Sequence, residues 1–176
     1  HPAGNIGTLV HETEPMNQGE RVWSVGAEDV TIIGELFKTG KFNAERTVAV
    51  TGESAKARKY YKTLIGAEIQ SFVGEIDKNS RLISGDVLTG DKVEATSYMN
   101  FYDNELSVIP EGDNYRMFGW LPFKDNHVHS MSKTSLSWLF PKKKYSINTN
   151  LNGEERALVV TGEMEEVMPL DIYPME

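Results

Sequence analysis

The chain has 176 residues, a formal net charge of -8 at pH 7 and no cysteine. A chain of this length can bury about 70% of the surface that it exposes when unfolded, so a real core is possible. The acidic balance disfavours nucleic acid as a partner, because phosphate groups would be repelled. The lack of cysteine excludes disulfides, thiolate nucleophiles, cysteine-based zinc sites and ordinary iron–sulfur ligation. No apolar run approaches the ~20 residues that a membrane span needs.

One helix is predicted near the start of the chain. Apolar residues recur at helical spacing from Val30 to Phe37, and Gly40 is placed to end the helix. We therefore expect a helix from about residue 27 to 38. Residues 1–22 are rich in Gly, Pro and Asn and are interpreted as connecting chain.

A strand is predicted directly after this helix. Residues 46–50 form an unbroken β-prone run, the kind of strand that is buried on both faces of a parallel sheet. A helix followed by a strand suggests half of an α/β unit. We therefore expect residues 1–55 to be part of a Rossmann-like α/β domain whose other strands precede His1. The chain is interpreted as the middle of a longer protein.

The next stretch follows the order of a β-grasp domain, which we expect over residues 56–113. Gly85 and Gly90 flank a Val87–Leu88 pair that we expect to be buried. Both are structural glycines, placed where a backbone takes positive φ or approaches another group closely. The predicted elements are strand 59–65, a short helix in which Ile69, Phe72 and Val73 share a face, strand 81–83, and a hairpin of 98–102 and 106–109 that turns at Asp103-Asn104.

The remaining residues carry weaker patterns. We expect a β-rich segment over residues 114–162, with a last strand at 156–161, and the start of a C-terminal helical region at 163–176. The fold class is therefore α/β with mixed α+β character: a partial Rossmann-like unit, a β-grasp domain and a further β-rich segment.

Motifs that would identify an active site are missing. The sequence has neither a G-x-G-x-x-G that opens a helix after a strand, nor a P-loop, nor a G-x-S-x-G elbow. No catalytic, cofactor-binding or metal-ligating residue is predicted. His127 and His129 have a spacing that some metal sites use, but no third ligand follows, so we favour a role without metal.

Two clusters are candidates for contact with a ligand or partner. Phe118 and Trp120, with Phe123, could stack on a flat apolar ring such as a quinone, although packing in a core or interface is the favoured alternative. Lys142 to Lys144 could touch anionic lipid headgroups or an acidic neighbour, although a solvated loop is the favoured alternative.

A set of ordered motifs extends over essentially the whole chain. The motifs are Pro2-Ala3-Gly4, Gly7-Thr8 with His11, Trp23-Ser24-Val25-Gly26 with Asp29-Val30, Ser84 to Gly90, Phe118-Gly119-Trp120, Gly162-Glu163, and Val167 to Pro174. Together they resemble the NqrA family, which supplies one subunit of the sodium-translocating NADH:quinone oxidoreductase.

The resemblance implies a non-redox, peripheral subunit on the cytoplasmic face of the bacterial inner membrane. The implied complex couples NADH oxidation and ubiquinone reduction to sodium-ion export, and its NADH, flavins, iron–sulfur centre and ubiquinone are not expected on these residues. The implied partners are the other subunits of the complex and ubiquinone, and the implied fold contains a soluble-ligand-binding β-grasp (SLBB) domain. Phe118 and Trp120 are the candidates for contact with quinone or a partner subunit. The fragment alone is expected to be inactive, and the alternative is a soluble small-ligand-binding β-grasp module outside any respiratory complex.

Overall fold

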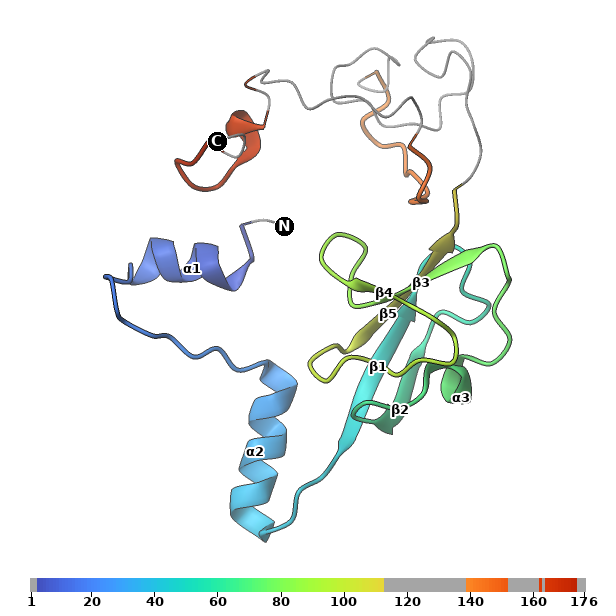
Figure 1. Cartoon of the computed structure of the whole chain (residues 1–176), viewed down its shortest axis with the longest axis horizontal. Coiled ribbons are helices and arrows are strands. Elements are labelled where there is room, and N and C mark those ends of the chain that lie inside the picture. Colours follow the sequence, from blue (N-terminus) through green and yellow to red (C-terminus); the bar gives the residue numbers. More distant parts are fainter. Residues whose placement is uncertain (1–2, 113–138, 152–161, 163, 174–176) are drawn as a thin grey trace. The chain divides into compact units, whose positions relative to one another are not determined.

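A computed structural model describes residues 3–112, 139–151, 162 and 164–173 (Figure 1). The chain divides into two compact units. Unit 1 comprises His1–Lys41 with Arg156–Glu176, and unit 2 comprises Phe42–Glu155. The predicted strand at 156–161 falls outside the described residues.

Unit 1 begins with a helix that the sequence analysis missed. Helix α1 runs from Ile6 to Thr13, and Asn5 is its N-cap, with an extended backbone at φ -69° and ψ 142°. The expectation that residues 1–22 are connecting chain is therefore wrong for this stretch. Asn5 occupies the N-cap position, although its side chain makes no capping hydrogen bond. The N–H of Leu9 donates to the C=O of Asn5 at 3.0 Å and closes the first turn.

The second helix of unit 1 confirms its prediction closely. Helix α2 runs from Ala27 to Thr39 and ends at Gly40, which has φ +70° in the left-handed region. Its acidic first turn and basic last turn suit the helix dipole. Its apolar face is largely exposed among the described residues, however, since Val30 is 56% and Phe37 is 85% exposed. Ile32 is the buried residue of this helix.

Unit 2 contains a five-stranded sheet in the order β2-β1-β5-β3-β4. The last strand lies in the middle, parallel to β1 and antiparallel to β3, while the hairpins β1–β2 and β3–β4 lie on either side (Figure 1). This arrangement is that of a β-grasp and agrees with the expected mixed α/β fold class. The elements are β1 (Glu45–Thr51), β2 (Tyr60–Leu64), α3 (Ile69–Val73), β3 (Ser80–Ser84), β4 (Asp91–Val93) and β5 (Glu105–Pro110).

Strand β1 is present as predicted, but its partners are different from those expected. It pairs antiparallel with β2 and parallel with β5, so both neighbours follow it in sequence. The expectation that its partners precede His1 is therefore wrong. Its burial also alternates, with Val48 and Val50 buried and Thr47 exposed, which is the pattern of a strand with one core face.

The predicted hairpin of 98–102 and 106–109 is wrong in one half. Residues 106–109 lie in β5, but β5 pairs with β1 and β3 and not with 98–102. Among the described residues, 98–102 form no strand and make only an isolated bridge between Tyr98 and Glu68. Strand β3 instead forms a hairpin with β4, which is only 3 residues long.

The core of unit 2 lies on one face of this sheet. Alternate residues of β1 and β5 point into it, as strand geometry requires, and α3 and Met99 close it. Gly52 follows β1, has φ +97°, and lies so close to the backbone of Val108 that a side chain would collide with it. The core residues are Val48, Val50, Ile69, Leu82, Met99, Leu106 and Val108.

The glycine turn between β3 and β4 is tight. Gly85 has φ +97°, and a Cβ at Gly90 would lie 2.7 Å from both the carbonyl oxygen of Asp86 and a methyl group of Ile83. The expected burial of the pair between them is wrong, because Val87 is half-buried and Leu88 is 72% exposed. The turn is compact in its backbone and presents Leu88 to solvent.

The last described part of the chain has little regular structure. Residues 139–151 contain no strand, and unit 1 ends in a short 3₁₀ helix, η2 (Glu165–Val167). The expected β-rich segment over 114–162 and the helical region at 163–176 remain predictions. None of the helices in the described part is long and apolar enough to cross a membrane.

Candidate functional site

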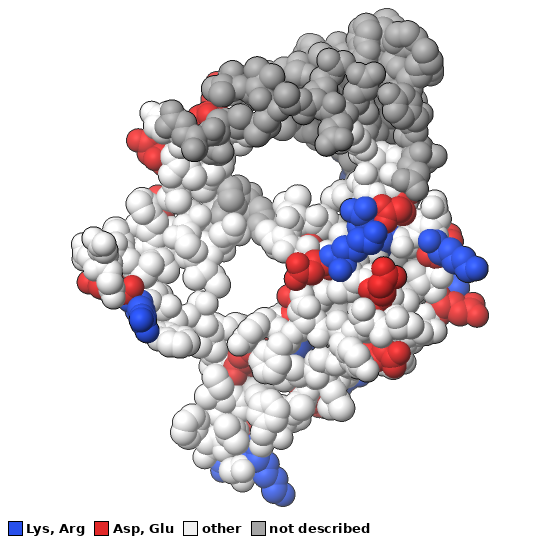
Figure 2. Space-filling model, in the orientation of Figure 1, with Lys and Arg blue, Asp and Glu red and all other residues white. Residues whose placement is uncertain are grey.

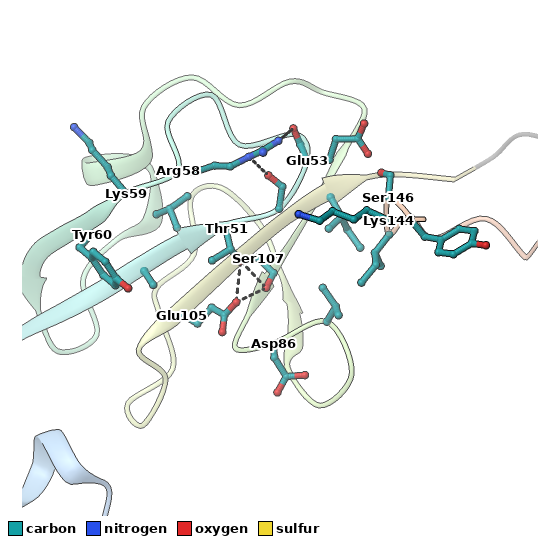
Figure 3. A pocket seen from close by; sticks show the side chains of 17 residues that line it. Thr51, Glu53, Arg58, Lys59, Tyr60, Asp86, Glu105, Ser107, Lys144 and Ser146 are labelled. Carbon is teal, nitrogen blue, oxygen red and sulfur yellow. Dashed lines mark hydrogen bonds between the residues drawn. The ribbon is translucent and has the colours of Figure 1, made fainter. Parts of the chain in front are cut away.

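A groove of about 770 Å³ lies over the sheet of unit 2 (Figure 3). Its floor is formed by the residues of β1 and β5 that alternate with the core residues. The groove therefore lies on the face of the sheet opposite the core. The walls come from the connection between β1 and β2, the glycine turn, and residues 144–147. The polar and charged residues of the lining are Thr51, Glu53, Arg58, Lys59, Asp86, Glu105, Ser107, Lys144 and Ser146.

Three polar side chains meet on the floor of the groove. The parallel register places Thr51 opposite Ser107 and Ala49 opposite Glu105. The Thr51 hydroxyl donates to Glu105 Oε1 at 2.8 Å, and the Ser107 hydroxyl donates to the carbonyl oxygen of Gly85 at 3.0 Å. Glu105 is half-buried and held from one side by these hydroxyls, so its carboxylate is a fixed acceptor in the groove.

Arg58 fixes the upper wall of the groove. Its Nε donates to the carbonyl oxygen of Gly52 at 2.9 Å, and its Nη2 donates to the carbonyl oxygen of Glu53 at 3.2 Å (Figure 3). The guanidinium thus satisfies backbone acceptors in the connection between β1 and β2. We interpret Arg58 as a residue that shapes the wall.

Asp86 organises the wall formed by the glycine turn. Its Oδ1 accepts from the N–H of Leu88 at 2.7 Å, and its Oδ2 accepts from the hydroxyl of Thr89 at 2.6 Å. The Thr89 hydroxyl, followed by the Leu88 N–H, lowers the pKa of Asp86, because both stabilise the carboxylate. The turn therefore presents a charged carboxylate at neutral pH.

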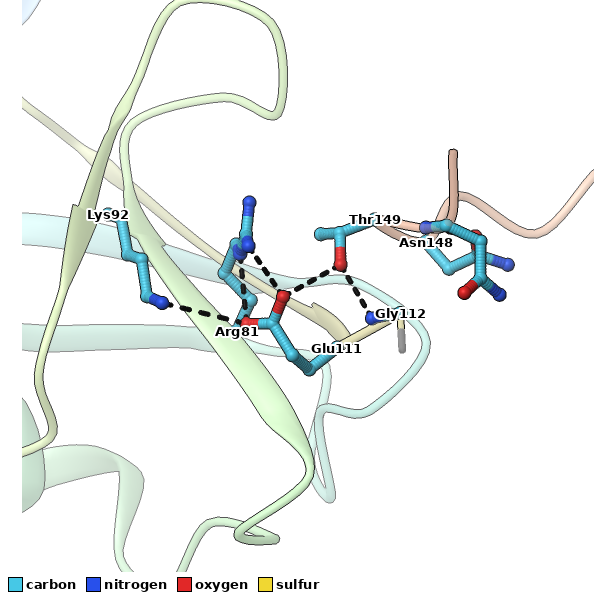
Figure 4. Close-up of polar contacts among 7 residues, drawn as sticks. Arg81, Lys92, Glu111, Gly112, Asn148 and Thr149 are labelled. Atoms are coloured by element: carbon cyan, nitrogen blue, oxygen red, sulfur yellow. Dashed lines mark hydrogen bonds and ion pairs between the residues drawn. The ribbon is translucent and has the colours of Figure 1, made fainter. Parts of the chain in front are cut away.

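A second polar cluster anchors the segment that forms the remaining wall (Figure 4). Glu111 accepts from Arg81 Nε at 3.0 Å and from Arg81 Nη2 at 2.5 Å, and Lys92 lies 3.8 Å away. The hydroxyl of Thr149 donates to Glu111 at 2.8 Å and accepts from the N–H of Gly112 at 2.6 Å. This cluster, which we call the Glu111 clamp, ties residue 149 to the sheet.

The hydrogen bonds of the Glu111 clamp change its acidity. The side-chain hydrogen bond from Arg81, followed by that from Thr149, lowers the pKa of Glu111, while partial burial acts in the opposite direction. Residues 144–147 lie a few positions before Thr149, so the clamp also restrains the wall of the groove.

The described residues that line the groove include no histidine. The Thr51 hydroxyl donates to the Glu105 carboxylate, and the Ser107 hydroxyl donates to the carbonyl oxygen of Gly85. In the part of the chain that the structure describes, no group of three or more His, Cys, Asp or Glu could hold a metal ion. On the face drawn in Figure 2, acidic and basic side chains interleave over the sheet of unit 2.

The residues singled out in the sequence fall mostly outside this groove. Phe118, Trp120, His127 and His129 lie outside the described residues. Gly85 and Gly90 lie in the turn that forms one wall, next to Asp86.

Sequence reasoning missed the groove because its lining comes from five separate segments. A signal was available in β5, where the polar residues Glu105 and Ser107 alternate with the apolar residues Leu106 and Val108.

Two family models match the chain. The model described as the NqrA second alpha/beta domain matches residues 1–42, and the model described as the NQRA C-terminal domain, of SLBB type, matches residues 47–95. Curated relatives match over the whole chain. The NqrA subunit of the Na(+)-translocating NADH-quinone reductase of Alcanivorax borkumensis is 40% identical over 179 residues, which cover 100% of this chain and 40% of that protein.

The chain belongs to the NqrA family. The NqrA of Neisseria meningitidis serogroup B is also 40% identical, over 99% of this chain and 39% of its own length. The NqrA of Yersinia pestis is 39% identical over 98% of this chain. The chain thus spans about 40% of the length of the curated NqrA proteins that it matches. The SLBB match covers β1 to β4 and so includes the strand that the sequence analysis assigned to the preceding domain.

Proposed function

We propose that this chain is part of a non-redox, peripheral subunit of a respiratory complex that couples NADH oxidation and ubiquinone reduction to sodium-ion export. The observation that carries the proposal is 40% identity to NqrA over the full length of the chain. The agreement of the β-grasp sheet with the SLBB match supports the same assignment.

The proposed role is assembly rather than electron transfer. NADH, flavins, the iron–sulfur centre and ubiquinone belong to the whole complex, and this chain alone is expected to be inactive. The subunit would dock on its membrane partners at the cytoplasmic face of the bacterial inner membrane. Phe118 and Trp120 are the proposed contacts to quinone or to a partner subunit.

The test is purification of the tagged full-length subunit from its own detergent-solubilised membranes. We expect membrane subunits and flavin to co-purify, and NADH:quinone reduction by the sample to increase with sodium. A subunit recovered alone after gentle solubilisation, without flavin and without sodium-stimulated activity, would contradict the proposal.

The proposed quinone contact has a separate test in the purified complex. Phe118→Ala and Trp120→Ala should raise the KM for ubiquinone at least several-fold and leave the KM for NADH unchanged. Phe37→Ala is the matched control, because this aromatic side chain is 85% exposed. An unchanged quinone KM in both variants would remove these residues from the site.

The groove of unit 2 favours a second candidate, a small-ligand-binding β-grasp module outside any respiratory complex. A concave site of about 770 Å³ with the fixed Glu105 carboxylate on its floor has the size and polar content of small-molecule sites. This candidate predicts a stable lone subunit that carries a small molecule through purification. Native mass spectrometry of that subunit distinguishes the two candidates.

A further inference from the structure

The carboxylate of Glu105 differs from the other half-buried carboxylates that the structure describes in unit 2, which are those of Asp86, Asp103 and Glu111. Both oxygens of Asp86 accept hydrogen bonds within the glycine turn, and both oxygens of Glu111 contact basic side chains. Asp103 accepts a hydrogen bond from Ser84 and does not line the groove. Glu105 lines the groove and keeps one oxygen without a hydrogen bond from any described residue.

The two oxygens of Glu105 have different surroundings. Oε1 accepts from the Thr51 hydroxyl at 2.8 Å and lies 3.4 Å from the Ser107 hydroxyl, so the carboxylate is held in one orientation (Figure 3). Oε2 accepts no hydrogen bond from the described residues, and none of them forms an ion pair with Glu105. A partly buried carboxylate is stabilised by a counter-charge, and its hydrogen bonds to cationic donors are the strong ones. Oε2 is therefore suited to a cationic donor.

The basic side chains that line the groove do not supply this counter-charge. Arg58 donates to two backbone carbonyl oxygens, and Lys59 Nζ lies 4.8 Å from the centre of the Tyr61 ring. Lys144 is exposed, and Figure 3 shows its side chain apart from the carboxylate of Glu105, with which it forms no ion pair. A cation from outside the described residues can therefore occupy the place next to Oε2.

The strand register places an aromatic ring on the same face as Glu105. Ala49 of β1 is paired with Glu105 of β5 on one side and with Tyr60 of β2 on the other. Paired residues project to the same face of a sheet, and two strand spacings separate β2 from β5 by about 10 Å. Tyr60 and Ala49 both line the groove. The small side chain of Ala49 thus leaves room between a carboxylate and an aromatic ring.

We propose that the groove binds a small organic ammonium ion. Its N–H donates to Glu105 Oε2, and its apolar body lies over Ala49 against the ring of Tyr60. The net charge of -8 favours the approach of a cation. A metal ion is a poorer match, because the described residues contain no group of three or more His, Cys, Asp or Glu that could hold one. The inference goes beyond the assembly role proposed above and names a ligand class for the second candidate.

The test titrates the full-length subunit with 2-phenylethylamine and with the neutral analogue 2-phenylethanol, followed by saturation-transfer NMR of the ligand. We expect the amine to bind at least about tenfold more tightly than the alcohol, because a hydrogen bond between ionised partners is stronger. Glu105→Gln should remove this preference by weakening amine binding about tenfold. It should leave alcohol binding unchanged, since the amide oxygen can still accept from Thr51.

Three further variants separate the site from general effects. Glu94→Gln is the matched control, because it makes the same change at an exposed position of unit 2 outside the groove lining, and it should leave both affinities unaltered. Tyr60→Ala should weaken amine and alcohol binding alike by several-fold, because the apolar body loses its wall. Lys144→Ala should strengthen amine binding about twofold, because it removes a like charge from the lining.

The proposal is overturned if the amine does not bind or binds no more tightly than the alcohol. It is also overturned if Glu94→Gln weakens amine binding as much as Glu105→Gln does, or if Lys144→Ala weakens that binding. A subunit that binds the amine through Glu105 but forms no sodium-dependent complex would contradict the proposed assembly role alone. A subunit that forms the complex but does not bind the amine would contradict this inference alone.

Discussion

The two units of this chain differ in how far they bury their apolar side chains. In the sheet of unit 2, Val48 and Leu106 are 1% and 0% exposed, whereas Val30 and Phe37 of helix α2 are 56% and 85% exposed. Unit 2 therefore buries its own core among the described residues, and the described helices of unit 1 do not. We infer that stability resides mainly in the sheet and that substitutions in the two units will have very different costs.

The largest contrast is expected between a buried and an exposed apolar side chain. Leu106→Ala should lower the free energy of unfolding by about 3–4 kcal/mol, because it opens a cavity in the central strand. Phe37→Ala should cost less than about 0.5 kcal/mol, because its side chain is largely in solvent. Urea titration of both variants of the full-length subunit measures the difference. Equal losses would show that α2 is buried in the same cooperative unit.

A second contrast compares two glycines with positive φ. Gly52→Ala should cost about 3 kcal/mol, because the new Cβ combines backbone strain with a collision against the backbone of Val108. Gly40→Ala should cost only about 1 kcal/mol, since Gly40 ends α2 and has open space around it. Thermal unfolding followed by circular dichroism separates the two. A mild effect of Gly52→Ala would mean that β1 and β5 can separate at this point.

The Glu111 clamp gives the stability of the sheet unit a pH dependence. Its pKa is lowered below the usual 4.5, so the ionised clamp contributes its full stability above that pH. The contribution is then lost as the pH falls through the lowered folded-state pKa. Glu111→Gln should remove about 1 kcal/mol at pH 7 and flatten the acid side of the stability profile. A profile of unchanged slope in the variant would assign the pH dependence elsewhere.

The smallest expected effect concerns the glycine turn. Thr89→Val removes the hydroxyl that contributes most to lowering the pKa of Asp86, so that pKa should rise toward its usual value of 3.8. Carbon-detected NMR titration of the carboxyl group measures the change. Thr63→Val, at a half-buried position of β2, is a matched control that should leave the pKa of Asp86 unaltered. An identical rise in the control would show that the turn does not depend on this hydrogen bond.

Local signals predicted much of the fold. Helix α2 was predicted because its apolar spacing, its charged ends and Gly40 agree with one another. Helix α1 was missed because its start contains Gly4 and Gly7, which suggest a loop, and because its first turn has no acidic residue. Local chemistry therefore predicted an element where all its signals agreed and failed where they competed.

Strand pairing was harder to predict, because it depends on residues far apart in sequence. Strand β5 was predicted, but its partners β1 and β3 lie well before it in the sequence, and no local pattern identifies them as its partners. Strand β4 is 3 residues long, too short for its alternation to be read. The groove was hard to predict for the same reason, because Thr51 and Glu105 meet only when β1 and β5 pair in this register.

The most direct test of the account is complementation of a bacterium that lacks its own gene for this subunit. Sodium-stimulated NADH:quinone reduction is measured in its membranes with and without the full-length subunit. We expect this activity to be lost in the deletion strain and restored by the full-length subunit, but restored poorly by the variant carrying Leu106→Ala. Membranes that keep full sodium-stimulated activity without the subunit would contradict its place in the complex.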